Sequence, residues 1–160
     1  MCAIVDANVV SEVFGTNPSE AGVEFFRWVE SNPNGRVVVG GKLLEELDRV
    51  SGFRQWAREV TLSGRRSIRK IDNDRVNKRE NHLRESSVCS SNDPHIIALA
   101  QLSGARLLYS NDKKLQQDFN NKDLISNPRG KIYSTNEGRT AFSPAHRRML
   151  ARRDLCQARP

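Results

Sequence analysis

Apolar residues along the chain fall into two patterns, helical spacing and short unbroken runs. The clearest helical pattern begins directly after Asp93, has Pro94 at its first position and stops at Gly104. Its apolar positions recur every three or four residues and are Ile96, Ile97, Leu99, Ala100 and Leu102. The unbroken run that follows, residues 105–109, predicts a buried strand. A helix leading into a buried strand is part of a parallel α/β unit.

Two earlier segments show a strand followed by a helix. Residues 1–5 predict a short apolar strand that ends at Asp6, and helical spacing then continues through Val9, Val10, Val13 and Phe14. Residues 36–39 predict another strand, which leads through two glycines into a helix. The apolar face of that helix carries Leu43, Leu44, Leu47 and Val50. The chain therefore has the pattern of an α/β protein with parallel strands.

Two further helices are expected to build the core. Pro18-Ser19-Glu20 starts one of them, and the turn-forming residues 32–35 end it. Its apolar face is expected to carry Val23, Phe26 and Val29. Residues 53–62 predict the other, with Phe53, Trp56, Ala57 and Val60 buried. Trp56 has an alternative role as a stacking platform for a nucleic-acid base, but an aromatic residue at helical spacing is more often part of the core.

Acidic residues stand where these strands end. Asp6 follows the first strand, and the tripeptide Ser-Asn-Asp occurs twice, ending at Asp93 and at Asp112. Glu46 lies beside the apolar face of the helix that follows the strand at residues 36–39. Ligands of parallel sheets gather outside the carboxyl ends of the strands, so these side chains are candidates for metal binding. The alternative for Asp93 and Asp112 is helix capping, because Asp is among the best N-cap residues.

Length and composition suit one compact domain, with 160 residues of which 37% are hydrophobic and 28% charged. The start of the chain lacks the pattern of a signal peptide, and no apolar stretch is long enough to span a bilayer, so we expect a soluble, cytoplasmic protein. Cys2, Cys89 and Cys156 are odd in number and far apart, which suggests neither a disulfide framework nor a metal site.

Positive charge is concentrated near the C-terminus. Residues 128–160 contain 8 Lys or Arg and 2 Asp or Glu, which accounts for +6 of the net charge of +7. Residues 131–134 predict a last edge strand, and Ser143-Pro144 predicts the start of a helix that carries paired arginines. Residues 136–160 therefore form a basic extension, which either contacts phosphates or an acidic protein, or is a solvated tail. Residues 64–84 are also strongly polar and basic.

Other catalytic chemistries lack their residues. Gly35, Gly40, Gly41 and Lys42 do not match a phosphate-binding loop, because Arg36 and Leu43 stand where that motif needs Gly and Ser or Thr. The chain has no Gly-x-Ser-x-Gly elbow and no paired Cys and His, which disfavours covalent acyl chemistry. His95 has no second histidine at metal-ligand spacing and is expected to support the site, whereas His82 and His146 are expected at the surface.

Four segments together resemble the PIN-domain nucleases, a family that includes VapC-type toxins and RNA-processing enzymes. They are the strand-Asp-x-Asn opening, the helix Leu-Leu-Glu-Glu-Leu-Asp-Arg, and the two segments that begin with Ser-Asn-Asp. The resemblance covers about residues 3 to 135, in order and with family-like spacing. It implies a three-layer α/β/α sandwich with a central parallel sheet, in which residues 1–135 form the nuclease domain.

The resemblance also implies a set of site residues. Asp6, Glu46, Asp93 and Asp112 would form an acidic quartet that binds Mg²⁺ or Mn²⁺, with Asn8 and Ser110 as polar supports. Glu45 is adjacent to Glu46, and only one of the two can face the strand ends. We choose Glu46, because the family pattern places the acid directly before Leu-Asp-Arg.

The implied activity is that of a metal-dependent endoribonuclease, in which a metal-activated water cuts an RNA phosphodiester bond and leaves a 5′-phosphate and a 3′-hydroxyl. Basic residues expected to contact RNA are Arg65, Arg66, Arg69, Arg147, Arg148, Arg152 and Arg153. Two alternatives stay open. One is a non-catalytic module that binds RNA or a protein, and the other is a toxin controlled by an antitoxin protein. The sequence does not decide the oligomeric state, including whether the chain forms a homo-oligomer.

Overall fold

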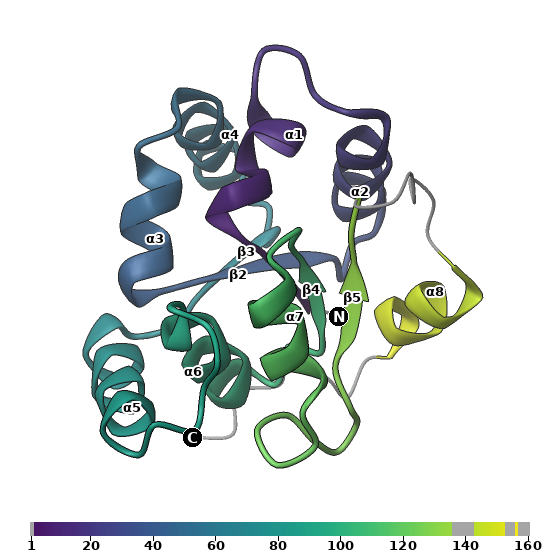
Figure 1. Cartoon of the computed structure of the whole chain (residues 1–160). Coiled ribbons are helices and arrows are strands. Elements are labelled where there is room, and N and C mark those ends of the chain that lie inside the picture. The colour runs from purple at the N-terminus through teal and green to yellow at the C-terminus, as the bar shows by residue number, and fades with distance from the viewer. Residues whose placement is uncertain (1, 136–142, 153–155, 157–160) are drawn as a thin grey trace.

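A five-stranded parallel β-sheet forms the centre of the protein in the computed structural model, which describes residues 2–135, 143–152 and 156 (Figure 1). The strands stand in the order β3-β2-β1-β4-β5, and every neighbouring pair is parallel. Their bounds are β1 Cys2–Val5, β2 Arg36–Val39, β3 Ile68–Lys70, β4 Leu107–Tyr109 and β5 Lys131–Tyr133. The central strands β1, β2 and β4 are almost wholly apolar, as expected where helices cover both faces of a sheet.

Helices lie on both sides of this sheet, so the expected three-layer α/β/α sandwich with a central parallel sheet is confirmed (Figure 1). A 3₁₀ turn, η1, spans Ala7–Val9. The α-helices are α1 Val10–Phe14, α2 Glu20–Ser31, α3 Gly41–Asp48, α4 Ser51–Leu62, α5 Asn73–Glu85, α6 Pro94–Ser103, α7 Lys113–Asn120 and α8 Pro144–Ala151.

The order of the strands reverses between β1 and β4. The chain runs outward from β1 to β2 and β3, then crosses back through α5 and α6 to β4, which pairs with the free side of β1. Ligands of open α/β sheets bind outside the carboxyl ends of the strands at such a reversal. The fold therefore directs attention to the residues that follow β1 and β4.

The core joins the sheet to α2 through aromatic rings. Phe25 of α2 is fully buried, with its ring centroid 5.3 Å from that of Tyr109 and 6.4 Å from that of Tyr133. On α4, Trp56 is 4% exposed and its indole N–H donates to Glu30 Oε1 at 2.8 Å. Trp56 thus has the core position that its helical spacing indicated, and a role in base stacking is not supported.

The predicted face of α2 is wrong by part of a turn. Val23 was expected in the core but is 37% exposed, whereas Phe25 and Val29 are buried and Phe26 is half-buried. The apolar residues of this helix cover more than one face, so spacing alone allowed two choices of the buried side. The position of the sheet decides between them.

Two elements were not predicted, β3 and α5, both in the polar segment 64–84. β3 is only three residues long and lies at the edge of the sheet, which explains its polar composition. α5 starts at the capping residue Asp72, whose side chain accepts a hydrogen bond from the Arg75 N–H at 2.9 Å. It buries only Val76, Glu80 and Leu83. So few apolar positions gave no clear helical signal.

The C-terminal segment contains the predicted helix, α8, and packs against β5. His146 of α8 was expected at the surface but is half-buried. Its ring lies edge-on to Tyr133 at 5.6 Å, Nδ1 accepts from the Ser143 N–H, and Nε2 contacts the Ile132 carbonyl oxygen. Residues 136–142 and Arg153 of the basic extension lie outside the described residues. His82 is exposed, as expected.

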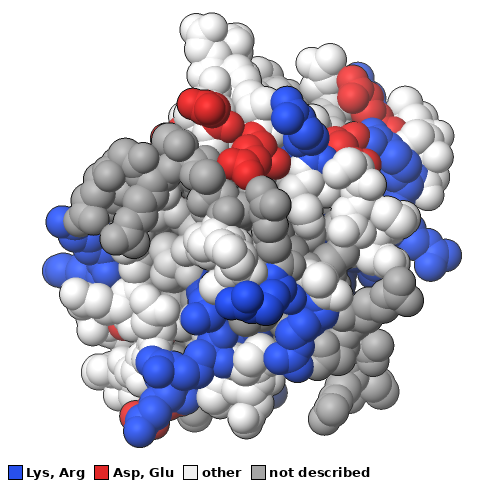
Figure 2. Space-filling view, turned by 90° about the vertical axis from the view of Figure 1, so that its right-hand side faces the viewer, with Lys and Arg blue, Asp and Glu red and all other residues white. Residues whose placement is uncertain are grey.

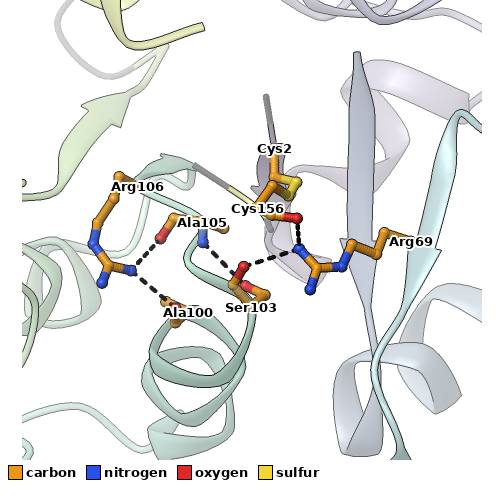
Figure 3. Close-up of a disulfide and its surroundings, with 7 residues drawn as sticks. All are labelled: Cys2, Arg69, Ala100, Ser103, Ala105, Arg106 and Cys156. Atoms are coloured by element: carbon orange, nitrogen blue, oxygen red, sulfur yellow. Dashed lines mark hydrogen bonds between the residues drawn. A yellow bond between two sulfur atoms is a disulfide. The ribbon is translucent and has the colours of Figure 1, made fainter. Parts of the chain in front are cut away.

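A disulfide joins Cys2 of β1 to Cys156, which corrects the expectation from the sequence that the cysteines form no disulfide framework (Figure 3). The two Cα atoms are 5.6 Å apart although 154 residues separate them in the chain, so spacing along the sequence could not reveal the pair. Arg69 of β3 lies beside this disulfide and donates from Nη1 to the carbonyl oxygens of Ser103 and Cys156. Cys89 is a free thiol.

Within the part of the chain that the structure describes, no helix is long and apolar enough to cross a membrane. The cytoplasmic location remains a prediction. The disulfide argues against it, since such bonds persist in oxidising compartments and are rare in cytosolic proteins.

Reduction of the disulfide should destabilise the protein. Its loop spans 154 residues, so the chain-entropy estimate for the stabilisation is about 5 kcal/mol. We expect urea unfolding to show this loss when a reductant is added, and Cys156→Ser to unfold like the reduced protein in both conditions. Thiol titration of the denatured, unreduced protein should find only Cys89 reactive. A finding that all three cysteines react would contradict the pairing.

Candidate functional site

The four predicted acids come from four different elements that meet near the carboxyl ends of β1 and β4. Asp6 directly follows β1, and Asp112 follows β4 and caps α7. Glu46 is on α3, and Asp93 is the residue before α6. The charge of Asp93 raises the pKa of Asp6 and that of Glu46, and the charge of Asp112 raises the pKa of Asp93. The four acids therefore share one electrostatic environment.

Asp6 and Ser110 form the centre of this group. The Asp6 N–H donates to the Tyr109 carbonyl oxygen at 2.9 Å, which continues the pairing of β1 with β4 beyond the strand ends. The Ser110 hydroxyl donates to Asp6 Oδ2 at 2.7 Å. Both residues are buried. Ser110 therefore lies where the resemblance placed a polar support, in direct contact with Asp6.

Asn8 supports Asp6 in a different way from Ser110. Its side chain is exposed, but its backbone N–H interacts with the Asp6 carboxyl group and lowers the pKa of that group. This contact requires the tight 3₁₀ turn that follows β1 and does not depend on the amide side chain. The sequence signal at Asn8 thus concerns the turn more than a side-chain ligand.

Helix capping explains one aspartate and not the other. Asp112 Oδ1 accepts the Leu115 N–H at 2.9 Å, and its own N–H donates to Ser110 Oγ at 3.1 Å. Asp93 precedes α6 in the same way, but its side chain accepts no capping hydrogen bond. The Asp93 carboxylate is therefore held at the site without a capping role that would account for it.

Glu46, not Glu45, faces the other acids. Glu45 is exposed, whereas the Glu46 side chain is 23% exposed and its Oε2 lies 3.4 Å from His95 Nε2. The charges of Asp93 and Asp6 both act on Glu46. The geometry thus agrees with the choice made between the two adjacent glutamates.

The shared environment raises the pKa of three carboxyl groups. Burial is the largest cause of the raised pKa of Asp6. The Ser110 hydrogen bond lowers this pKa, whereas repulsion by Asp93 and Asp112 raises it. Burial likewise raises the pKa of Glu46, with repulsion by Asp93 and Asp6 opposed by Lys42. The pKa of Asp93 is raised by burial and then by Asp112. A divalent cation would relieve this repulsion.

The acids do not form a closed coordination cage. Among residues 2–135, 143–152 and 156, no three His, Cys, Asp or Glu side chains lie close enough together to hold a metal ion as they stand. Their oxygen atoms are nevertheless the ligand type that Mg²⁺ and Mn²⁺ prefer. The charges of these carboxylates act on one another, but their side chains do not form a metal-binding cluster in the part of the chain that the structure describes.

Sequence reasoning missed the cation beside these acids, Lys42. It stands in the first turn of α3, and its Nζ lies 4.0 Å from Glu46 Oε1 with the side chain 45% exposed. Its charge also acts on Asp93 and His95. Lys42 was considered only for a phosphate-binding loop, and the turn of α3 that brings it to Glu46 is visible only once the helix is known.

Asp118 was also missed, although it lies in the same segment as Asp112. It is 2% exposed on α7, and its two carboxylate oxygens accept the N–H groups of Ser90 and Ser91 at 2.8 and 2.9 Å. These serines belong to the loop that leads into Asp93. Asp118 therefore fixes the approach of Asp93, while the other end of α7 carries Asp112.

The predicted RNA-contacting arginines are dispersed. Arg65 forms an ion pair with Glu30, Arg66 is exposed, and Arg69 lies beside the disulfide. Ser103 ends α6, so Arg69 is separated from Asp93 by the length of that helix, about 15 Å for its 10 residues. The prediction that Arg69 contacts RNA is therefore not supported, because its guanidinium binds backbone carbonyls at the opposite end of the sheet.

The basic C-terminal segment lies on another face. Arg148 and Arg152 are exposed, the side chain of Arg147 is outside the described residues, and so is Arg153. Figure 2 shows Lys and Arg side chains in the lower half of the face that carries β5 and α8, whereas acidic and basic side chains are mixed in its upper part. Lys and Arg side chains thus lie near β5, at a different place from Lys42, the cation beside Glu46.

Comparison of the chain with protein-family models, with curated proteins and with solved structures finds no match. The likeness to PIN-domain nucleases therefore rests on the four sequence segments alone, and the arrangement of the acids carries the functional argument.

Because burial and mutual repulsion raise the pKa values of Asp6, Glu46 and Asp93, these three acids should contribute less to the stability of the metal-free protein as pH rises. A folded-state pKa above the unfolded value contributes stability at low pH that is lost as pH rises through the folded pKa. In EDTA, we expect the melting temperature of Asp93→Asn to fall less than that of wild type between pH 4 and pH 7. The same substitution at exposed Asp48 should leave the wild-type slope. Parallel slopes for all three proteins would contradict the coupling.

Proposed function

We propose that the protein is a metal-dependent endoribonuclease whose site is formed by Asp6, Glu46, Asp93 and Asp112. The observation that carries this proposal is the mutual electrostatic coupling of these carboxylates beside the strand reversal of the sheet. Folding gains nothing from a group of like charges, and Asp93 has no capping bond to explain it. Binding of a divalent cation supplies the missing stabilisation.

The residues present fit Mg²⁺ or Mn²⁺ by the chemistry of their oxygen donors. Asp6, Glu46 and Asp93 would hold the cation, with Asp112 at a second position or bonded through water. A bound divalent cation would lower the pKa of a water molecule and neutralise charge on the phosphate. Small movements of Glu46, which is on a helix surface and partly exposed, would bring the donors closer.

The reaction proposed is hydrolysis of a phosphodiester bond. The oxygen of water forms a bond to phosphorus, the bond from phosphorus to the 3′ oxygen breaks, and the departing oxygen gains a proton. Ser110 would hold Asp6 in one orientation by its 2.7 Å hydrogen bond, which leaves Asp6 Oδ1 for the site. Asp118 would keep the Asp93 loop in place. Lys42 offers a positive charge for the substrate phosphate.

Activity tests this proposal directly. Purified wild-type protein should cleave RNA in Mg²⁺ or Mn²⁺, leave 5′-phosphate ends, and stop when EDTA is added. Asp93→Asn should lower the rate by at least about a hundredfold, as expected when a group acting on the transition state is lost. Circular dichroism should show that the variant is folded.

The matched control is Asp48→Asn, which alters an exposed aspartate of α3 and should cleave like wild type. Equal activity of Asp93→Asn and wild type would show a contaminating nuclease and reject the assignment. Tight RNA binding without cleavage in either metal would instead identify the non-catalytic alternative.

The salt dependence of RNA binding would locate the path of the RNA. Each phosphate contact that is lost should flatten the log-log salt slope by about 0.7 for a single strand. We expect Lys42→Gln, beside Glu46, to lower this slope, measured in Ca²⁺ to avoid cleavage. The pair Arg148→Gln and Arg152→Gln tests the C-terminal face in the same assay. An unchanged slope for a variant would remove that residue or pair from the interface.

A further inference from the structure

His95 is a polar side chain in a fully buried, apolar environment. It lies in the first turn of α6 with an exposed fraction of 0%, and the residues that follow it on the helix are apolar and buried. Neither Nδ1 nor Nε2 has a hydrogen-bond partner among the described residues. Buried polar groups are normally paired, and an unpaired one costs free energy, so His95 requires an explanation other than packing.

The ring lies between two of the proposed metal ligands. Its Nε2 is 3.4 Å from Glu46 Oε2, and its Nδ1 is 4.0 Å from Asp93 Oδ1. Neither contact is a hydrogen bond as it stands, but the Glu46 contact needs only a small movement to become one. Glu46 is 23% exposed in its side chain and is the acid with room to move.

The unpaired Nε2 of the imidazole is placed to donate a hydrogen bond to Glu46. A neutral imidazole carries one N–H and one unprotonated nitrogen. With the proton on Nε2, the ring can donate to Glu46 without neutralising its charge. Such a hydrogen bond orients a carboxylate and leaves it able to bind a cation.

We propose that His95 is a positioning residue for Glu46, donating its Nε2–H to Glu46 Oε2 when that carboxylate moves inward with Asp93 to bind a divalent cation. This inference rests on the proposed metal site. It explains why a histidine that weakens the metal-free core occupies a position where an apolar side chain would pack without an unpaired group. It assigns His95 no contact with RNA and no proton transfer.

Three substitutions separate this role from a structural one. His95→Leu replaces the ring by an apolar side chain and removes both unpaired nitrogens. His95→Gln places an amide N–H where Nε2 lies, whereas His95→Asn places one near Nδ1. The measurement is the melting temperature in EDTA, followed by titration with Mn²⁺ to find the concentration that gives half of the maximal stabilisation.

We expect His95→Leu to melt no lower than wild type in EDTA, because it buries no unpaired polar atom. Its half-maximal Mn²⁺ concentration should rise about tenfold or more, as is usual when a residue that orients a metal ligand is lost. His95→Gln should stay near the wild-type concentration, and His95→Asn should behave like His95→Leu. A purely structural histidine would give the opposite pattern in EDTA, with a lower melting temperature for His95→Leu.

The outcomes distinguish this inference from the proposed function. If Mn²⁺ does not stabilise wild type, the metal site itself is rejected, and with it the role of His95. If Mn²⁺ stabilises wild type and His95→Leu at the same concentration, the metal site stands and the role of His95 is overturned. If His95→Leu does not fold, His95→Gln is compared with His95→Asn instead. Equal half-maximal Mn²⁺ concentrations for these two variants would overturn the positioning role of His95.

Discussion

The parallel pairing of β1 with β4 is the constraint on which the candidate site depends. β1 is hydrogen-bonded to β2 on one side and to β4 on the other, so the chain must cross the sheet before β4 can form. That pairing ends with the Asp6 N–H on the Tyr109 carbonyl oxygen, and the next side chains, Asp6 and Ser110, are then within hydrogen-bond distance. A shift of β4 by one residue would turn Ser110 to the other face and leave Asp6 buried without its partner.

The buried acids lower the free energy of unfolding, and the rest of the fold must offset this loss. Asp6 is almost fully buried and near other carboxylates, a combination that opposes ionisation. Apolar strands that are covered on both faces, the aromatic contacts of Phe25, and the disulfide at the far end of β1 stabilise the framework. The stabilising and destabilising parts lie at opposite ends of the same strand, since Cys2 begins β1 and Asp6 follows it.

Helices complete the site from outside the sheet. α3 carries both Glu46 and Lys42 on neighbouring turns, so the same helix supplies an acid and a cation. α7 links the two Ser-Asn-Asp segments: its N-cap is Asp112, and its Asp118 holds the loop that ends at Asp93. These contacts join elements that are separated in the sequence. The distance between Asp93 and Asp112 therefore depends on both α7 and the loop that ends at Asp93. Glu46 and Asp93 in turn flank His95.

The sequence by itself determined the class of fold and indicated the four candidate acids, whose role in the site stays a prediction. Strand and helix patterns that are long and periodic, such as residues 94–103, follow from local burial and capping, and the order of strands and helices implies parallel pairing. Short or polar elements escaped prediction, since β3 and α5 owe their structure to the neighbours they cover. Tertiary structure alone decided which face of α2 is buried, that Arg69 binds the carbonyls of Ser103 and Cys156, that Cys2 meets Cys156, and that Lys42 and His95 stand beside Glu46. The physical reason is the same in each case: these contacts join residues that chain spacing does not relate, and only packing of the whole sheet brings them together.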